Sequence, residues 1–148
     1  MSKKTLTRPE IEKLIPHRDP ILLLDNVTAW EKDKWIEATY HAAEGSPHFT
    51  GHFPGNPILP GVLIIEAIAQ SAAVLTSLSL DVTSEKVLYL FTGIKDVRLL
   101  APVRPGDTLK FRAEKIRDKL GLYLFSGTAH VNDDLAVQAT FTAKIVYV

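Results

Sequence analysis

The sequence predicts an α+β fold in which an antiparallel sheet of five or more strands wraps around one long central helix. The run Pro60–Leu80 is apolar on nearly every helical face, which is typical of a helix surrounded by other structure. Most of the later chain alternates in part and is rich in β-branched and aromatic residues, which is typical of strands. Because no repeat, low-complexity tract or linker interrupts the sequence, we expect one domain over residues 1–148.

The first part of the chain predicts a short helix, two strands and a loop. Thr7–Glu10 resembles a capping box, and the helix that it begins covers about Pro9–Leu14. The segments Asn26–Glu31 and Trp35–His41 are predicted as strands joined by a charged turn. The glycines and prolines of Ala42–Leu59 predict a structured loop that leads into the long helix.

The second half of the chain predicts strands. Asp118–Gly121 and Asn132–Asp134 are expected to form hairpin turns, and Ala101–Asp107 breaks strand pairing. A sheet that wraps one helix leaves an open side, which a second subunit could cover. The predicted strands are Val87–Phe91, Lys95–Leu100, Thr108–Asp118, Leu120–Asn132 and Leu135–Val148.

Composition excludes several classes of function. The net charge of zero argues against a molecule built to hold nucleic acid or an anionic membrane. The absence of cysteine excludes disulfides, a thiol nucleophile and thiolate metal sites, and it fits a cytoplasmic location. The basic N-terminal segment lacks the apolar core of a signal peptide. Glu66 and Gln70 near the middle of the apolar run favour a buried helix over a membrane span.

His52 is the first candidate catalytic residue. It lies between Gly51 and Phe53 in a rigid loop, so its imidazole has a fixed position, an apolar neighbour and a pKa suited to proton abstraction. We expect Phe53 to contact substrate. The alternative is a structural histidine hydrogen-bonded within the loop, and His17 is interpreted in that way. His48 lies four residues before His52, but a loop without a third ligand predicts no metal site.

Glu66 is the second candidate, because an acid in an apolar helix has a raised pKa and can donate a proton near neutral pH. Gln70 projects from the same helical face and could orient the carboxyl group. The alternatives are an acid favoured by the helix dipole or a buried structural ion pair. Gly61 and Val62 at the helix start present backbone N–H groups that could bind a carbonyl oxygen as it becomes an enolate, although such helix starts are commonly only structural.

Together these parts suit elimination of water from a 3-hydroxyacyl thioester, or its reverse. A base removes the proton next to the carbonyl, the helix start holds the enolate charge, and an acid protonates the leaving hydroxyl. The apolar helix and the sheet would supply a slot for the acyl chain.

At this point the chain resembles the 3-hydroxyacyl-[acyl-carrier-protein] dehydratases of type II fatty acid synthesis, the FabZ family, which have the hot-dog fold. The block His48–Gln70 carries the most specific part of the resemblance. Asp19 replaces an aromatic residue that is usual in the family, and Leu99–Ala101 lacks aromatic and basic residues common there. Supporting matches are Ile15–Pro20, Leu22–Asp25, Phe91–Ile94, Arg98 and Pro102–Asp107.

The resemblance implies that His52 and Glu66 are the catalytic pair and are supplied by different subunits of a dimer. It implies that the Gly61 N–H contacts the thioester carbonyl and that Gln70 hydrogen-bonds the glutamate. It also implies a homo-oligomer, a dimer or a trimer of dimers, and a (3R)-3-hydroxyacyl substrate converted to a trans-2-enoyl thioester. No separate cofactor is expected, because the phosphopantetheine arm of acyl carrier protein carries the substrate.

Residues 95–119 hold eight basic and four acidic side chains, including Arg98 and Arg104. The resemblance gives this excess a use in docking the acidic carrier protein, and the alternative is a solvated face. Two other functions remain open: a hot-dog acyl thioesterase, or a module that binds acyl carrier protein without catalysis.

Overall fold

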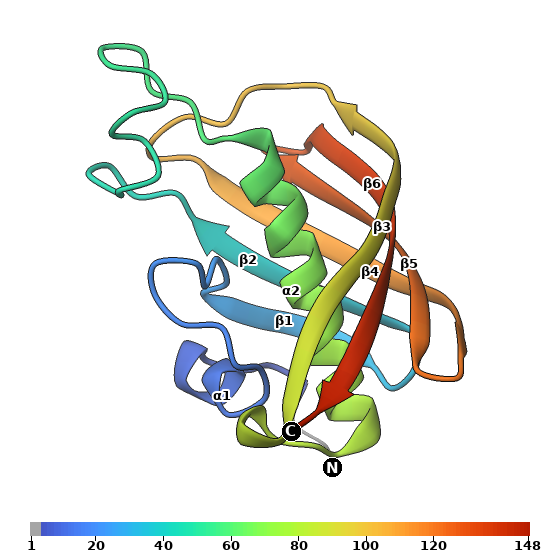
Figure 1. Ribbon diagram of the computed structural model, residues 1–148. Coiled ribbons are helices and arrows are strands. Elements are labelled where there is room, and N and C mark those ends of the chain that lie inside the picture. The colour runs from blue at the N-terminus through green and yellow to red at the C-terminus, as the bar shows by residue number, and fades with distance from the viewer. Residues whose placement is uncertain (1–3) are drawn as a thin grey trace.

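Six strands and one long helix make up most of the computed structural model, which describes residues 4–148 (Figure 1). The strands form one antiparallel sheet in the order β1-β2-β4-β5-β6-β3, which curves around α2 (Gly61–Leu80). The predicted α+β arrangement is therefore confirmed. The strands are β1 (Asn26–Glu31), β2 (Trp35–His41), β3 (Val87–Leu99), β4 (Thr108–Lys119), β5 (Leu122–Val131) and β6 (Asp134–Tyr147).

The N-terminal segment packs against the first edge of the sheet. Helix α1 (Arg8–Glu12) begins after Thr7, whose backbone N–H donates to Glu10 Oε1 at 3.0 Å, so the predicted capping box is present. The helix is one residue earlier at its start and two shorter at its end than expected. Leu6 pairs with Val27 of β1, which partly covers that edge. Met1–Lys3, the first residues of the expected domain, lie outside the described part.

Helix α2 is the core of the fold. It begins after Pro60, and Asp81 ends it in the left-handed conformation at φ 55°. The helix is long and apolar enough to cross a bilayer, but 67% of its most apolar window is buried inside the protein. It is therefore a core helix and not a membrane span, as the sequence predicted.

Gly127 on β5 lets α2 lie directly on the sheet. A Cβ atom at this position would be 2.2 Å from Cγ2 of Ile68 and 3.1 Å from the carbonyl oxygen of Arg112. Both distances are shorter than ordinary contacts, so only glycine fits without a shift of the helix or the sheet. This close approach fixes the position of the first half of α2, which carries Glu66.

The prediction of two separate strands over residues 87–100 was wrong. They form the single strand β3, which pairs with β6 and absorbs register shifts at Phe91/Gly93 and Lys95/Arg98. A short 3₁₀ helix, η1 (Ser84–Lys86), precedes it. The turn expected at Asp118–Gly121 consists of Leu120 and Gly121, both at positive φ, between the end of β4 at Lys119 and the start of β5 at Leu122.

Strand β3 forms the other edge of the sheet, with β6 on one side and no strand on the other among residues 4–148. Its apolar side chains are unusually exposed for a long strand. Edges of this kind are normally covered or blunted in native proteins. The exposed apolar residues of β3 are Leu88, Leu90, Phe91, Ile94, Val97 and Leu99.

Candidate active site

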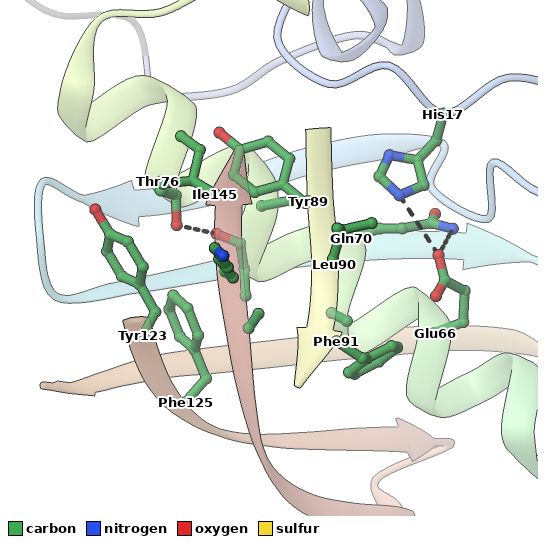
Figure 2. A pocket seen from close by; sticks show the side chains of 15 residues that line it. His17, Glu66, Gln70, Thr76, Tyr89, Leu90, Phe91, Tyr123, Phe125 and Ile145 are labelled. Atoms are coloured by element: carbon green, nitrogen blue, oxygen red, sulfur yellow. Dashed lines mark hydrogen bonds and ion pairs between the residues drawn. The ribbon is translucent and has the colours of Figure 1, made fainter. Parts of the chain in front are cut away.

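Glu66 extends from the second turn of α2 into a pocket between the helix, the segment before β1 and the sheet (Figure 2). Small side chains on α2 leave room along the helix, and aromatic rings from the sheet close the far side. The pocket is lined by His17, Glu66, Ala69, Gln70, Ala72, Ala73, Thr76, Tyr89, Leu90, Phe91, Tyr123, Phe125, Ala143, Lys144 and Ile145.

Gln70 holds the Glu66 carboxyl group in place. Its amide nitrogen donates to Glu66 Oε2 at 2.8 Å and to the carbonyl oxygen of Ile21 at 2.8 Å, and its Oε1 accepts from the Leu23 N–H at 2.9 Å. Gln70 is fully buried, so this set of three bonds satisfies an otherwise costly polar group. The amide therefore links α2 to the segment before β1. The helical spacing predicted its contact with Glu66 but not its bonds to Ile21 and Leu23.

Burial raises the pKa of Glu66, and the hydrogen bond from Gln70 opposes part of that rise. A carboxyl group with a raised pKa keeps its proton to higher pH than an exposed glutamate does. Such a group can act as a general acid near neutral pH.

His17 is the residue at this site that sequence reasoning missed. Its Nε2 lies 3.5 Å from Glu66 Oε2, and burial together with the neighbouring Arg18 lowers the pKa of His17. The sequence places His17 and Glu66 in unrelated elements 49 residues apart. No local spacing could have joined them, because the contact depends on how the segment before β1 folds over α2.

His52 lies in the loop between β2 and α2, which projects beyond the helix start (Figure 1). Its Nδ1 is 2.8 Å from the carbonyl oxygen of Ile58, and its ring stacks on Phe53 with centroids 4.1 Å apart across a cis peptide bond. Because a carbonyl oxygen only accepts, Nδ1 carries the hydrogen and Nε2 presents its lone pair. That is the form a general base requires.

The structure does not bring His52 and Glu66 together within one chain. His52 is absent from the lining of the Glu66 pocket, and no hydrogen bond or ion pair joins the two side chains within residues 4–148. Each residue is held by its own neighbours in a separate place. One copy of the chain therefore holds the two candidate catalytic residues in separate places.

The helix start forms a second hollow. Gly61 and Val62 are the first residues of α2, where N–H groups have no acceptor inside the helix. A Cβ atom on Gly61 would lie 3.0 Å from Cδ1 of Leu99, so glycine leaves space that any other residue would fill. The Val62 side chain is exposed. The hollow is lined mainly by Ile58, Leu59, Gly61, Ile64, Leu99, Leu100 and Val137.

Some of the basic side chains of residues 95–119 form ion pairs with acidic side chains among residues 4–148, and others do not. Arg112 pairs with Glu37 and Glu114. Arg104 donates to Asn56 Oδ1 at 3.1 Å, which places it beside the loop that carries His52. Arg98 lies exposed on β3, and no ion pair involves it in the described part of the chain. The solvated-face interpretation thus fits Arg112 better than Arg98 or Arg104.

Comparison with known proteins gives one family and one fold. The FabA-like domain family matches residues 15–140. A protein named 3-hydroxyacyl-[acyl-carrier-protein] dehydratase FabZ from Aliivibrio fischeri is 43% identical over 136 residues, which cover 92% of this chain and 91% of that protein.

Solved structures with lower identity share the architecture. A structure titled as the dehydratase heterocomplex ApeI:P from Xenorhabdus doucetiae matches with a TM-score of 0.78 at 19% identity and covers 90% of this chain and 89% of its own. A thioesterase from Haemophilus influenzae matches with a TM-score of 0.65 at 21% identity, over 98% of this chain and 94% of its own. At these identities the likeness establishes the fold and does not distinguish the two reactions.

Proposed function

The chain belongs to the FabA-like family and to its FabZ-type 3-hydroxyacyl-[acyl-carrier-protein] dehydratases, and we propose that it eliminates water with His52 as the base and Glu66 as the acid. It is a hydro-lyase of fatty acid biosynthesis that acts on acyl groups carried by acyl carrier protein. The observation that carries this conclusion is the 43% identity to a FabZ dehydratase over 92% of the chain.

The proposed reaction follows from the separate geometries of the two residues. The Nε2 lone pair of His52 takes the proton from C2 of a (3R)-3-hydroxyacyl thioester, and the electron pair forms the C2–C3 double bond. Glu66 gives its proton to the hydroxyl on C3, and the C3–O bond breaks to release water. The trans-2-enoyl thioester then leaves. His52 has gained one proton and Glu66 has lost one, so exchange with solvent restores both.

The helix start stabilises the charge that develops during this step. The Gly61 and Val62 N–H groups are proposed to donate to the thioester oxygen as C2 loses its proton. A donor pair of this kind acts only in the transition state and is worth about 10²-fold or more in rate. Phe53, stacked on His52, supplies an apolar wall beside the reacting carbons.

A dimer is proposed to complete the site. His52 and Glu66 lie apart in one chain, and β3 offers an unpaired edge with exposed apolar side chains. Pairing of two β3 edges would cover those side chains and let His52 of one subunit meet Glu66 of the other. Three such dimers would give a hexamer.

Further proposals concern the partner and the setting. Arg98 and Arg104 are proposed to contact the acidic carrier protein, whose phosphopantetheine arm presents the substrate without a separate cofactor. We propose a cytoplasmic enzyme formed by a single hot-dog domain over residues 1–148.

Product analysis tests the function. Purified protein should convert 3-hydroxyacyl thioesters to enoyl thioesters, and His52→Ala and Glu66→Ala should each lower the rate by roughly 10³-fold. Free acid as the product would identify a thioesterase instead. Binding of acyl carrier protein without turnover would identify a carrier-binding module.

A further inference from the structure

His17 is a second nitrogen group on the catalytic carboxyl, and the reaction described above gives it no role (Figure 2). Its Nε2 lies 3.5 Å from Glu66 Oε2, the same oxygen that accepts from Gln70 at 2.8 Å. Its Nδ1 is buried and has no hydrogen-bond partner. No other buried side-chain nitrogen or oxygen among residues 4–148 lacks a partner.

The unpartnered nitrogen decides which tautomer His17 adopts. A neutral imidazole carries one hydrogen. With the hydrogen on Nε2, the donor nitrogen is the one that lies 3.5 Å from a carboxyl oxygen, and only a lone pair is left unsatisfied at Nδ1. On Nδ1 it would be a buried N–H without an acceptor, and the Nε2 lone pair would face the lone pairs of Oε2. The first arrangement is favoured on both counts.

Oε2 accepts from the Gln70 amide at 2.8 Å and is also the oxygen 3.5 Å from His17 Nε2, so it is the acceptor oxygen of the carboxyl group. The acid proton of Glu66 must then lie on Oε1. Resting on the proposed function, we propose that His17 is a positioning residue that, together with Gln70, keeps the acid proton on Oε1 and stabilises the carboxylate left when that proton is transferred. His17 acts through Glu66 and does not touch the substrate in this proposal.

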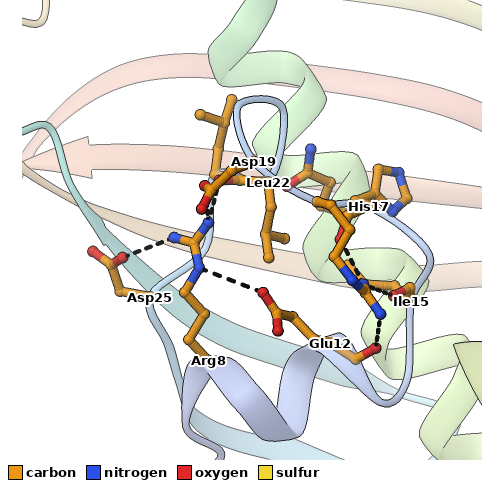
Figure 3. A network of polar contacts seen from close by, with 10 residues as sticks. Arg8, Glu12, Ile15, His17, Asp19, Leu22 and Asp25 are labelled. Atoms are coloured by element: carbon orange, nitrogen blue, oxygen red, sulfur yellow. Dashed lines mark hydrogen bonds and ion pairs between the residues drawn. The ribbon is translucent and has the colours of Figure 1, made fainter. Parts of the chain in front are cut away.

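A network of arginine contacts fixes the segment that carries His17 (Figure 3). Arg18 donates from Nη1 to the carbonyl oxygens of His17 at 2.7 Å and Ile15 at 2.9 Å, and from Nη2 to that of Glu12 at 2.8 Å. Arg8 contacts Asp19, and the carbonyl oxygen of Leu22 at 3.2 Å. These bonds fix the backbone of His17 and so hold its imidazole beside Glu66, as a positioning residue requires.

Other ionisable groups near the carboxyl do not replace His17. Arg18 points its guanidinium at backbone carbonyls, and Lys144 and the phenols of Tyr89 and Tyr123 line the same pocket from the sheet. Burial raises the pKa of Tyr89 to about 12 and also raises that of Tyr123. These groups are the same in all variants compared below, so a change at residue 17 reports on His17 alone.

Two substitutions of similar polarity separate positioning from a structural role. In His17→Gln the side-chain amide can place an N–H where Nε2 was, whereas in His17→Asn the shorter amide reaches only the Nδ1 position. We expect His17→Asn to lower kcat about tenfold with little change in KM. We expect His17→Gln to keep most of the wild-type kcat. The alkaline limb of kcat should move to higher pH in His17→Asn, because loss of a donor to the carboxylate raises the pKa of Glu66.

Nitrogen NMR of histidine-labelled wild-type protein gives a readout that needs no activity. A neutral His17 protonated on Nε2 supports the proposal, and a proton on Nδ1 or a doubly protonated ring overturns it. Equal kcat and equal alkaline limbs in wild type, His17→Asn and His17→Gln also overturn it. If His17→Asn fails to fold by circular dichroism, the NMR result decides. A wild-type protein without dehydratase activity would contradict the proposed function. The NMR measurement of the His17 tautomer would still test the proposal for His17.

Discussion

The amide nitrogen of Gln70 lies 2.8 Å from Oε2 of Glu66, one helical turn along α2, and the same amide binds the backbone of Ile21 and Leu23. The carboxyl group is thus oriented by a side chain that is itself fixed on three sides. Precision of this kind places a proton within reach of a substrate more reliably than a freely rotating acid could.

The raised pKa of Glu66 predicts the direction of the pH dependence of the reaction. A general acid must be protonated, so kcat should fall as the pH rises through the pKa of Glu66. Kinetic measurements of kcat against pH check this limb, which should lie above the range of an exposed glutamate. A flat alkaline profile up to the unfolding of the protein would contradict Glu66 as the acid.

Protein stability should follow the same group. The folded pKa of Glu66 is above the unfolded value, so its stabilising contribution is complete below the unfolded pKa and is lost as the pH rises through the folded pKa. Glu66→Gln cannot ionise and should lose less stability over that window. Urea unfolding of both proteins across the window measures the difference.

Mixing two inactive variants should restore activity if the site spans two subunits. Equal amounts of His52→Ala and Glu66→Ala, allowed to exchange subunits, give mixed dimers with one intact and one doubly altered site. Random exchange makes half of the dimers mixed, so roughly a quarter of wild-type activity is expected. No recovery after demonstrated exchange would place His52 and Glu66 of one chain in the same site.

Gly61→Ala should disturb the helix start through Leu99. The added Cβ would lie 3.0 Å from Cδ1 of Leu99, so the side chain or the first turn of α2 must move. We expect kcat to fall by about tenfold, less than the 10²-fold or more that follows loss of a whole oxyanion donor. The double variant Gly61→Ala/Leu99→Ala should recover part of that loss. Equal kcat in both variants would show that Leu99 is not the cause.

Gly127→Ala should destabilise the fold. A Cβ atom 2.2 Å from Ile68 cannot be accommodated without moving α2 from the sheet, and overpacking of this kind costs about 1–3 kcal/mol. Thermal unfolding should show a Tm that is lower by roughly 2–4 °C for each kcal/mol of stability lost in a chain of this size. Gly51→Ala is the control, because its Cβ would meet no atom within 4 Å.

Binding of acyl carrier protein should weaken when Arg98 and Arg104 are both changed to glutamine, and its affinity should depend less on salt than that of the wild type. Titration calorimetry at two ionic strengths measures both effects. Arg112→Gln is the matched control, because Arg112 already pairs with Glu37 and Glu114. Equal losses in all variants would indicate a general charge effect instead of a docking site.

Much of the fold could be predicted because local pattern decides it. The bounds of β1 and β2 follow from alternation, and α2 starts one residue after the predicted Pro60 because Pro60 is the N-cap residue, whose ψ of 131° is not helical. The single strand β3 was missed for a physical reason. Its Thr92–Ile94 stretch interrupts the alternation, which predicts a break between two strands. In the structure, pairing with β6 continues past a bulge at this point, so the strand is not interrupted.

The site was predictable where residues are close in sequence and not where they meet only in the fold. The interval from Glu66 to Gln70 is a helical spacing, so their contact was expected. His17 approaches Glu66 because the segment before β1 is held in place by Gln70 and by Arg8 and Arg18, contacts that no local sequence pattern predicts. Asp19 stands where the family resemblance leads us to expect an aromatic residue. It contacts Arg8 and so belongs to the network that holds this segment.

The anchoring of Ile21 and Leu23 by Gln70 couples Glu66, the proposed acid, to the N-terminal segment. Detachment of that segment would remove two of the three hydrogen bonds that fix the Gln70 amide. We therefore expect local opening of residues 21–23 to lower activity without unfolding the sheet. We expect this opening to cost less free energy than global unfolding, and hydrogen exchange at the Leu23 amide measures it.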